Sequence, residues 1–183
     1  MELFKTARIR AGNRKLARMA LRTNRSRAFL NLAEVKSIAI LWDISNADDL
    51  APISDFILQM SERGIKVDIL GFFQGKTLPD KLTAIRYLEC LKREDYSFFF
   101  RPKPAVANRF MEAGYEVLIE ICFRDNFPLR YVSTLSAARM KIGPAFKDDK
   151  TRSHIDMLID TGIESNVKEY LRQVIIYLEM INK

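Results

Sequence analysis

The sequence predicts an α/β fold: a three-layer, Rossmann-like, mostly parallel sheet with helices on both faces, preceded by a basic helical N-terminal arm. β-rich apolar runs alternate with stretches whose apolar residues recur at helical spacing. In residues 115–144 a strand, a polar break, a helix of about ten residues and a second strand follow one another. Such a unit implies a crossover between two parallel strands, which is the building block of an α/β sheet.

The first half of the predicted domain contributes two strands and one helix. The run Ser37–Trp42 is continuously apolar, as in a central strand that is covered on both faces. After a polar turn over residues 43–49, apolar residues at helical spacing predict a helix that ends at Gly64. Residues 65–72 form the second predicted strand, and residues 74–81 are rich in turn formers.

The middle of the chain is less regular. Residues 84–91 fit a helix or a strand, and aromatic enrichment favours a strand at Tyr96–Phe100. The two prolines in residues 101–104 require an extended or looped chain. A short helix is expected at Val106–Ala113, ended by Gly114.

The last third carries the clearest pattern. We expect a strand at Glu116–Ile121, a break at residues 124–126 and a helix with Pro128 in its first turn. An extended run at Met140–Ile142 closes the unit. A final strand is predicted over residues 153–160 and a final amphipathic helix over residues 166–181.

Composition indicates one domain over residues 35–183 behind an arm over residues 1–34. With 48% hydrophobic and 29% charged residues, the 183-residue chain is typical of a globular protein, and no apolar run approaches the ~20 residues of a membrane span. Cys90 and Cys122 lack the spacing of a zinc site or disulfide framework. We therefore expect reduced thiols and a cytoplasmic location.

The positive charge is concentrated in the arm. Residues 1–30 carry nine Lys or Arg against the single acid Glu2, a balance of +8, and the other 21 basic and 22 acidic residues give −1. The arm contains strong helix formers, although we expect Gly12-Asn13 to break or bend the helix. The basic residues that we predict to contact a partner are Arg8, Arg10, Arg14, Lys15, Arg18, Arg22, Arg25 and Arg27.

A segment this basic on a neutral body favours a polyanionic partner. Neutralising phosphates releases counterions and gives salt-sensitive, sequence-independent affinity. We therefore predict nucleic acid, RNA first, or a ribonucleoprotein such as the ribosome. An anionic membrane surface ranks second, because the arm lacks Trp and has a thin apolar face. A protein partner or self-association through the arm is the third alternative.

A second candidate site lies where strands end. In a parallel sheet, ligands bind beyond the carboxyl ends of the strands. The residues that could bind a small ligand, a sugar nucleotide or Mg²⁺ there are Asp43, Asn46, Arg124, Asp125 and Asn126. We favour the simpler interpretation, in which Asn46 or Asp48 and Asp125 or Asn126 cap helices and Asp160 shapes a turn. The sequence thus predicts no metal and no cofactor.

Other motifs carry little chemistry. The stretch GFFQGKT has three residues between its glycines, whereas a phosphate-binding loop needs four. His154 is the only histidine and has no sequence partner for a catalytic triad. The aromatic run of residues 98–100 beside Arg101 could stack bases, but a buried strand is the favoured interpretation. These observations leave an enzymatic activity open and favour a non-enzymatic binding protein.

Two resemblances agree with this fold. The succession AILWDIS, IKVDILGF, YEVLIEICFRDNFPLRYVSTLSAARMKIG, HIDMLID and a long C-terminal helix resembles a family of uncharacterised bacterial proteins, short α/β domains behind a basic arm. That resemblance implies a fold and no activity. The same segments are similar to the N-terminal Rossmann-like half of heptosyltransferase-type glycosyltransferases, whose K/R-[IV]-G strand is matched by Arg139, Lys141, Ile142 and Gly143.

Overall fold

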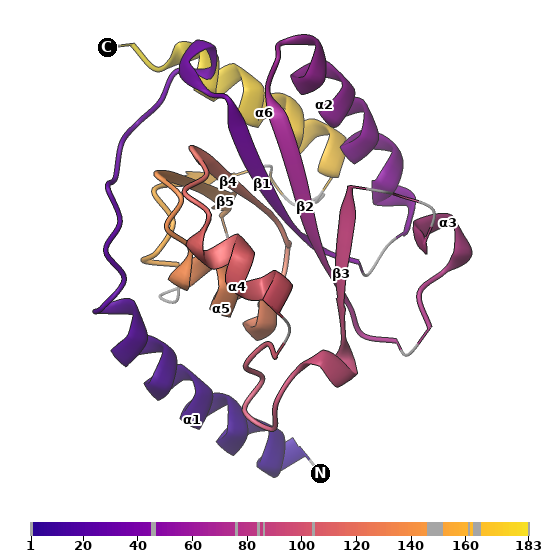
Figure 1. Cartoon of the computed structure of the whole chain (residues 1–183), viewed down its shortest axis with the longest axis vertical. Coiled ribbons are helices and arrows are strands. Elements are labelled where there is room, and N and C mark those ends of the chain that lie inside the picture. Colours follow the sequence, from indigo (N-terminus) through magenta and orange to yellow (C-terminus); the bar gives the residue numbers. More distant parts are fainter. Residues whose placement is uncertain are drawn as a thin grey trace.

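The protein is built on one six-stranded parallel sheet (Figure 1). The computed structural model describes residues 2–44, 47–75, 77–83, 85, 87–103, 105–145, 152–160, 162 and 166–182, with side chains from residue 7 onwards except those of 47 and 81. The strands are β1 (Ser37–Asp43), β2 (Lys66–Phe73), β3 (Leu88–Lys92), β4 (Val117–Ile121), β5 (Met140–Pro144) and β6 (Met157–Ile159). Their order is β3-β2-β1-β4-β5-β6, which is the Rossmann order and confirms the predicted fold class.

The most apolar run becomes the centre of the sheet, as the sequence predicts. Strand β1 pairs with β2 on one side and with β4 on the other, and Ile40 stands opposite Ile69 and Ile119. A strand in this position is covered on both faces, which is why it has no polar alternation. Strands β4 and β5 pair in parallel across their helical crossover, as expected for residues 115–144.

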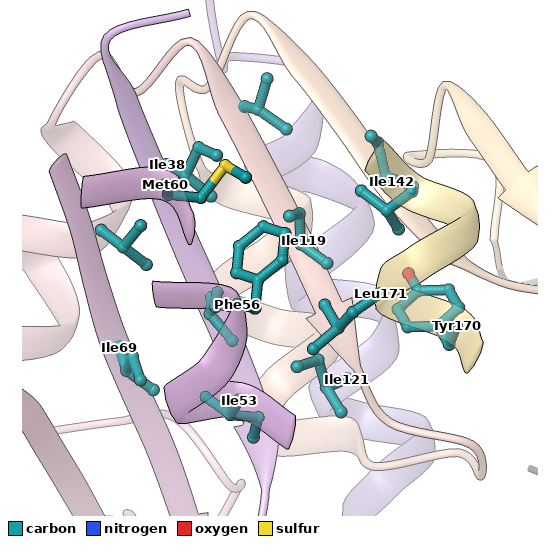
Figure 2. Packing of buried hydrophobic residues seen from close by; sticks show 14 of the residues in the cluster. Ile38, Ile53, Phe56, Met60, Ile69, Ile119, Ile121, Ile142, Tyr170 and Leu171 are labelled. Atoms are coloured by element: carbon teal, nitrogen blue, oxygen red, sulfur yellow. The ribbon is translucent and has the colours of Figure 1, made fainter. Parts of the chain in front are cut away.

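Two helices cover one face of the sheet. Helix α2 (Leu50–Glu62) lies beside α6 (Val167–Met180), and both bury their apolar sides against β1 and β4. Figure 2 shows Phe56 of α2 next to Ile119, with Leu171 and Tyr170 of α6 farther to the right on the same face of the sheet. Burial of one such side chain contributes about 1.5–3 kcal/mol, so this cluster is a main source of stability.

The other face carries α4 (Ala105–Glu112) and α5 (Phe127–Leu135), and the N-terminal helix α1 (Glu2–Ala20) lies outside α5. Figure 1 shows α1 in indigo along the outer side of this layer, joined to β1 by a long extended segment. Short helical turns occur at η1 (Leu32–Glu34), η2 (Ala47–Asp49), α3 (Asp80–Thr83) and η3 (Arg93–Asp95). The arm is therefore a docked outer layer, because its helix packs on α5.

Local signals explain the helix ends. The side chain of Asn126 accepts a hydrogen bond from Leu129 N at 3.3 Å, and Asn166 caps α6 in the same way. Gly64 closes α2 at φ 73°, a left-handed conformation that favours glycine. Asp160 accepts from Gly162 N and so shapes a turn, as predicted. Asp48 lies in η2, and the residue before α2 is Asp49, whose side chain makes no capping bond; the other predicted cap, Asn46, lies outside the described residues.

Two strand predictions are wrong in extent or kind. Residues 153–156 are a turn and a bend, so β6 begins only at Met157. Tyr96–Phe100 is a surface turn, described below, because its aromatic residues do not alternate between a buried and an exposed face. In the part of the chain that the structure describes, no helix is sufficiently long and apolar to cross a membrane.

Candidate nucleic-acid interface

Helix α1 is held on the domain by an apolar stripe. Ile9, Leu16 and Met19 recur at helical spacing and pack against Phe127 and Tyr131 of α5. The hydroxyl of Tyr131 donates to Met19 Sδ at 3.3 Å. The stripe fixes which side of α1 faces the protein, and therefore which side faces solvent.

Gly12 lies inside α1 and does not break it, contrary to the sequence prediction. A Cβ at this position would come within 2.8 Å of the Phe127 ring and 3.1 Å of the Phe99 carbonyl oxygen. Glycine therefore lets α1 approach α5 and the turn at residue 99 closely. The helix continues through Gly12 because this tertiary contact outweighs the roughly 1 kcal/mol propensity penalty.

The opposite side of α1 is basic and exposed. We call it the outer face of α1 and define it as Arg10, Arg14, Lys15 and Arg18 of the helix together with Arg22 of the turn that follows it, all of which are exposed. An open depression on this side is lined by Ala11, Arg14, Lys15, Arg18, Met19 and Arg22. None of the five cations forms an ion pair with an acidic residue of the described chain.

The remaining three basic residues of the predicted set are used within the protein. Arg8 donates from Nε to the Phe98 carbonyl oxygen at 2.7 Å, and its guanidinium lies over the Phe98 and Phe100 rings at 4.0 and 4.7 Å. The side chain of Arg25 is 6% exposed and binds Asp156 through both carboxylate oxygens. Arg27 is exposed, with its Nε 3.9 Å from Asp156. Arg25 is therefore not part of an accessible basic surface.

Arg25 anchors the extended segment after α1 to the far edge of the sheet. Its Nη1 donates to the His154 carbonyl oxygen at 3.4 Å, while Asp156 also accepts from Lys141 N of β5 at 2.8 Å. Ala28 N donates to the Arg139 carbonyl oxygen at 3.1 Å. These bonds run from the segment to β5 and to the start of β6, so the arm is fixed at both ends.

Sequence reasoning missed a second group of charges, which lies inside the protein. We call it the ion-pair cluster: Glu120 of β4, Lys141 of β5, and Arg152 and His154 before β6. Glu120 is 2% exposed, and its two oxygens contact Arg152 Nη1 at 2.7 Å and His154 Nε2 at 3.1 Å. Arg152 lies over Gly143, where a Cβ would come within 2.2 Å of its Nη2. A side chain at position 143 would displace the guanidinium from this place.

The cluster shifts the protonation of its members. Burial alone would raise the pKa of Glu120, but the hydrogen bond from His154 and the charge of Arg152 outweigh it and lower that pKa. Burial, reinforced by the positive charge of Arg25, lowers the pKa of Lys141 to about 7. Lys141 Nζ donates to the carbonyl oxygens of Ser133 and Thr134 at the end of α5. The only sequence signal for this group is a charged residue within each of two otherwise apolar strands.

The predicted ligand site at the strand ends is partly assembled. Asp43 and Arg124 meet where the strand order reverses between β1 and β4, with Arg124 Nε 2.9 Å from Asp43 Oδ2. The hydrogen bond from Arg124 to Asp43 raises the pKa of the arginine. Asp125 forms an ion pair with Arg130, whose Nε lies 3.2 Å from Asp125 Oδ1, and Asn126 caps α5. Asn46 lies outside the described residues, as does Lys76 of the GFFQGKT stretch.

The turn Tyr96–Pro102, which we call the aromatic turn, lies against α1. It is closed by pairing of Tyr96 with Pro102 and by a bond from Ser97 N to the Arg101 carbonyl oxygen at 2.8 Å. Phe98 and Phe99 are 63% and 49% exposed. Figure 1 shows the segment after β3 reaching α1 near its N-terminal end.

A family model for a family of unknown function, DUF6913, matches residues 9–181. The chain belongs to this family. Since the match begins in α1 and ends after α6, it includes most of the arm together with the domain. No curated protein matches the chain. Membership agrees with the resemblance to an uncharacterised family and carries no activity.

Proposed function

We propose that this protein is a non-enzymatic binding protein that contacts nucleic acid through the outer face of α1, and that RNA is the favoured partner. The observation that carries the proposal is the depression lined by Arg14, Lys15, Arg18 and Arg22, whose charges are not neutralised by acids of the described chain. Closely spaced unpaired cations suit a phosphate backbone, because each phosphate contact releases counterions.

The arrangement within the helix supports the same partner. Arg14 and Arg18 are four residues apart and Lys15 and Arg18 three apart, so like charges are neighbours on the helix surface. Each such pair destabilises a helix by about 0.2–0.5 kcal/mol. A polyanion would relieve this repulsion. Because α1 is docked through its apolar stripe, the cations are presented on a fixed surface.

Substitutions test this better than truncation, because removal of α1 would expose the apolar stripe's partners on α5. The test variant is Arg14→Gln/Lys15→Gln/Arg18→Gln. The matched control, Arg63→Gln/Lys66→Gln/Arg172→Gln, removes the same charge from cations that lie on α2, β2 and α6 or at their ends. Binding of a labelled RNA is measured by anisotropy at several salt concentrations.

We expect the α1 variant to bind RNA more weakly and to reduce the slope of log K against log salt by about 2 to 3, since each lost phosphate contact contributes about 0.7–0.9. The control should keep both the slope and most of the affinity. Equal behaviour of the two variants would contradict the proposal. Salt-insensitive self-association of the wild-type chain would instead favour a docking role for the arm.

One observation favours a second function, binding of a small ligand where the strand order reverses. Asp43 is 4% exposed, and its Oδ1 accepts no hydrogen bond from the described residues. A ligand hydroxyl or amine could supply one. A thermal-shift screen of nucleotides and sugar nucleotides, with and without Mg²⁺, tests this: a ligand should raise the midpoint for the wild type and not for Asp43→Ala. If no compound shifts the wild-type midpoint, this second function fails.

A further inference from the structure

The aromatic turn presents two phenylalanine rings to solvent directly beside the basic helix. Phe98 and Phe99 are T-shaped to each other, with ring centroids 5.2 Å apart. Isolated exposed apolar residues are ordinary, but here two adjacent phenylalanines on a turn stay largely exposed although Arg8 lies over the Phe98 ring.

The turn is held in shape by the fold. Phe100 N donates to the Ser97 carbonyl oxygen at 2.9 Å, and Arg101 N donates to Ser97 Oγ at 3.1 Å. Lys103 N donates to the Asp95 carbonyl oxygen at 2.8 Å, and the Tyr96 ring packs edge-on against Phe72. The backbone of the turn is therefore pre-organised.

The shape of the turn requires Phe100 to adopt an unfavourable backbone conformation. Its φ is 57°, the left-handed region in which glycine or asparagine usually closes a three-residue hairpin loop. A bulky residue there costs roughly 1–2 kcal/mol. The conformation turns the Phe100 ring towards Phe127, at a centroid distance of 6.3 Å, while Phe98 and Phe99 stay outside.

Arg8 and Gly12 join this turn to α1. Arg8 binds the Phe98 carbonyl oxygen and lies over two of the rings, and the missing side chain of Gly12 admits the Phe99 carbonyl. Lys15 follows Arg8 by seven residues, so both lie on nearly the same side of the helix. Their axial separation is about 10 Å at 1.5 Å per residue.

We propose that the aromatic turn is a base-stacking platform and that the partner is a single-stranded nucleic acid, whose phosphates follow the outer face of α1 while one or two bases stack on Phe98 and Phe99. Single-strand binders combine a positive groove with aromatic rings in this way. A duplex offers no unstacked base to these rings. The inference rests on the proposed function and specifies its partner.

The charge pattern favours nucleic acid over a membrane surface. The apolar stripe of α1 is buried on α5, so the apolar side chains that the structure describes on this helix are not available to enter a bilayer. The exposed apolar side chains near the helix are those of Phe98 and Phe99 at one end and of Leu21 and Phe29 in the segment after it, so they form no continuous face. Vesicles are therefore included in the test as the competing outcome.

The test compares three partners: a short labelled RNA without self-complementarity, the duplex that it forms with its complement, and vesicles of phosphatidylcholine and phosphatidylserine. The variant is Phe98→Ala/Phe99→Ala, and Phe98→Trp is the conservative exchange that keeps a stacking surface. The matched control is Phe29→Ala, which removes a phenylalanine that is 65% exposed in the segment after α1. Urea denaturation confirms that each variant is folded.

We expect the wild type to bind the single strand more tightly than the duplex. The double variant should lose roughly tenfold in affinity for the single strand and little for the duplex, with an unchanged salt slope, because stacking is lost and phosphate contacts remain. Phe98→Trp should retain the affinity, and Phe29→Ala should match the wild type.

The two possible failures differ. If the double variant binds the single strand like the wild type, the stacking platform is overturned while the phosphate surface stands. If the double variant loses vesicle binding and not RNA binding, the aromatic turn is directed at a membrane and the inference fails. If the wild type binds neither RNA, the proposed function fails as well.

Discussion

The outer face of α1 and the ion-pair cluster both concentrate ionised side chains. They differ in that the charges of the cluster are buried and have partners, whereas those of the outer face are exposed and have no acidic partner among the described residues. In the cluster, Glu120 is buried between Arg152 and His154, and the backbone satisfies Lys141. On α1, exposed cations lie next to each other and form no ion pair with an acidic residue of the described chain. Charges that are balanced internally serve the fold, and charges that the fold leaves unbalanced are available to a partner.

The largest expected effect comes from the cluster. Glu120→Gln keeps the shape of the side chain and removes the anion that faces Arg152. Breaking one side of a buried ion pair costs about 3–5 kcal/mol, because the remaining charge stays in a poorly solvated site. Urea denaturation measures this as a lower midpoint. Glu112→Gln, at an exposed position on α4, should stay within about 0.5 kcal/mol of wild type. Equal midpoints for the two variants would show that the ion-pair cluster does not stabilise the fold more than an exposed carboxylate does.

The attachment of α1 is expected to show the next largest effect. Gly12→Val places atoms where the Phe127 ring and the Phe99 carbonyl now lie, and such overpacking costs about 1–3 kcal/mol. Amide hydrogen exchange in α1 should accelerate as the helix loosens. Gly114→Val serves as the control, since a Cβ at Gly114 has nothing within 4 Å. Unchanged exchange in α1 would show that the close approach is not required for docking.

Lys141 should make stability depend on pH. Its pKa of about 7 in the folded protein lies below that of the unfolded chain, near 10.4, so the unfolded state binds the proton more tightly. Stability therefore rises as the pH increases above about 7, with a slope of at most about 1.4 kcal/mol per pH unit. Between pH 7 and 8.5 the wild type should gain about 1.5 kcal/mol relative to Lys141→Met. Parallel pH profiles in denaturation experiments would contradict this.

The smallest effect is expected on the outer face. Arg14→Gln/Lys15→Gln/Arg18→Gln should change the free energy of unfolding by less than about 0.5 kcal/mol, and in the stabilising direction, because like charges are removed. The control Arg63→Gln/Lys66→Gln/Arg172→Gln removes exposed ion pairs and should be slightly destabilising. Thermal unfolding of both variants measures the sign. A large loss of stability in the α1 variant would mean that these cations stabilise the fold.

The sequence predicts those features that are set by local patterns. The central place of Ser37–Trp42, the crossover in residues 115–144 and a cap at Asp125 or Asn126 all follow from periodicity and residue type, and the structure selects Asn126. The fate of Gly12 could not be predicted in this way, because it depends on Phe127, more than a hundred residues away. The same limit applies to Glu120, whose partner His154 is 34 residues distant.

The candidate site divides along the same line. The net charge of the arm is visible in the sequence, but which cations face solvent depends on the apolar stripe of α1 and on the position of Asp156. The sequence favours a strand for the aromatic run, because enrichment in phenylalanine does not reveal whether the rings are exposed. Its exposure follows from the left-handed backbone at Phe100, which residue type alone does not predict.

Docking of α1 also has a consequence for the order of events during synthesis. Met19 and its partner Tyr131 are 112 residues apart in the chain. At a translation rate of about 5–20 residues per second, α5 is completed roughly 6–22 s after α1. During that interval the most basic stretch of the chain has been synthesised, but α5, the helix on which α1 packs, has not. The nascent protein thus presents its positive charge before it has a folded domain.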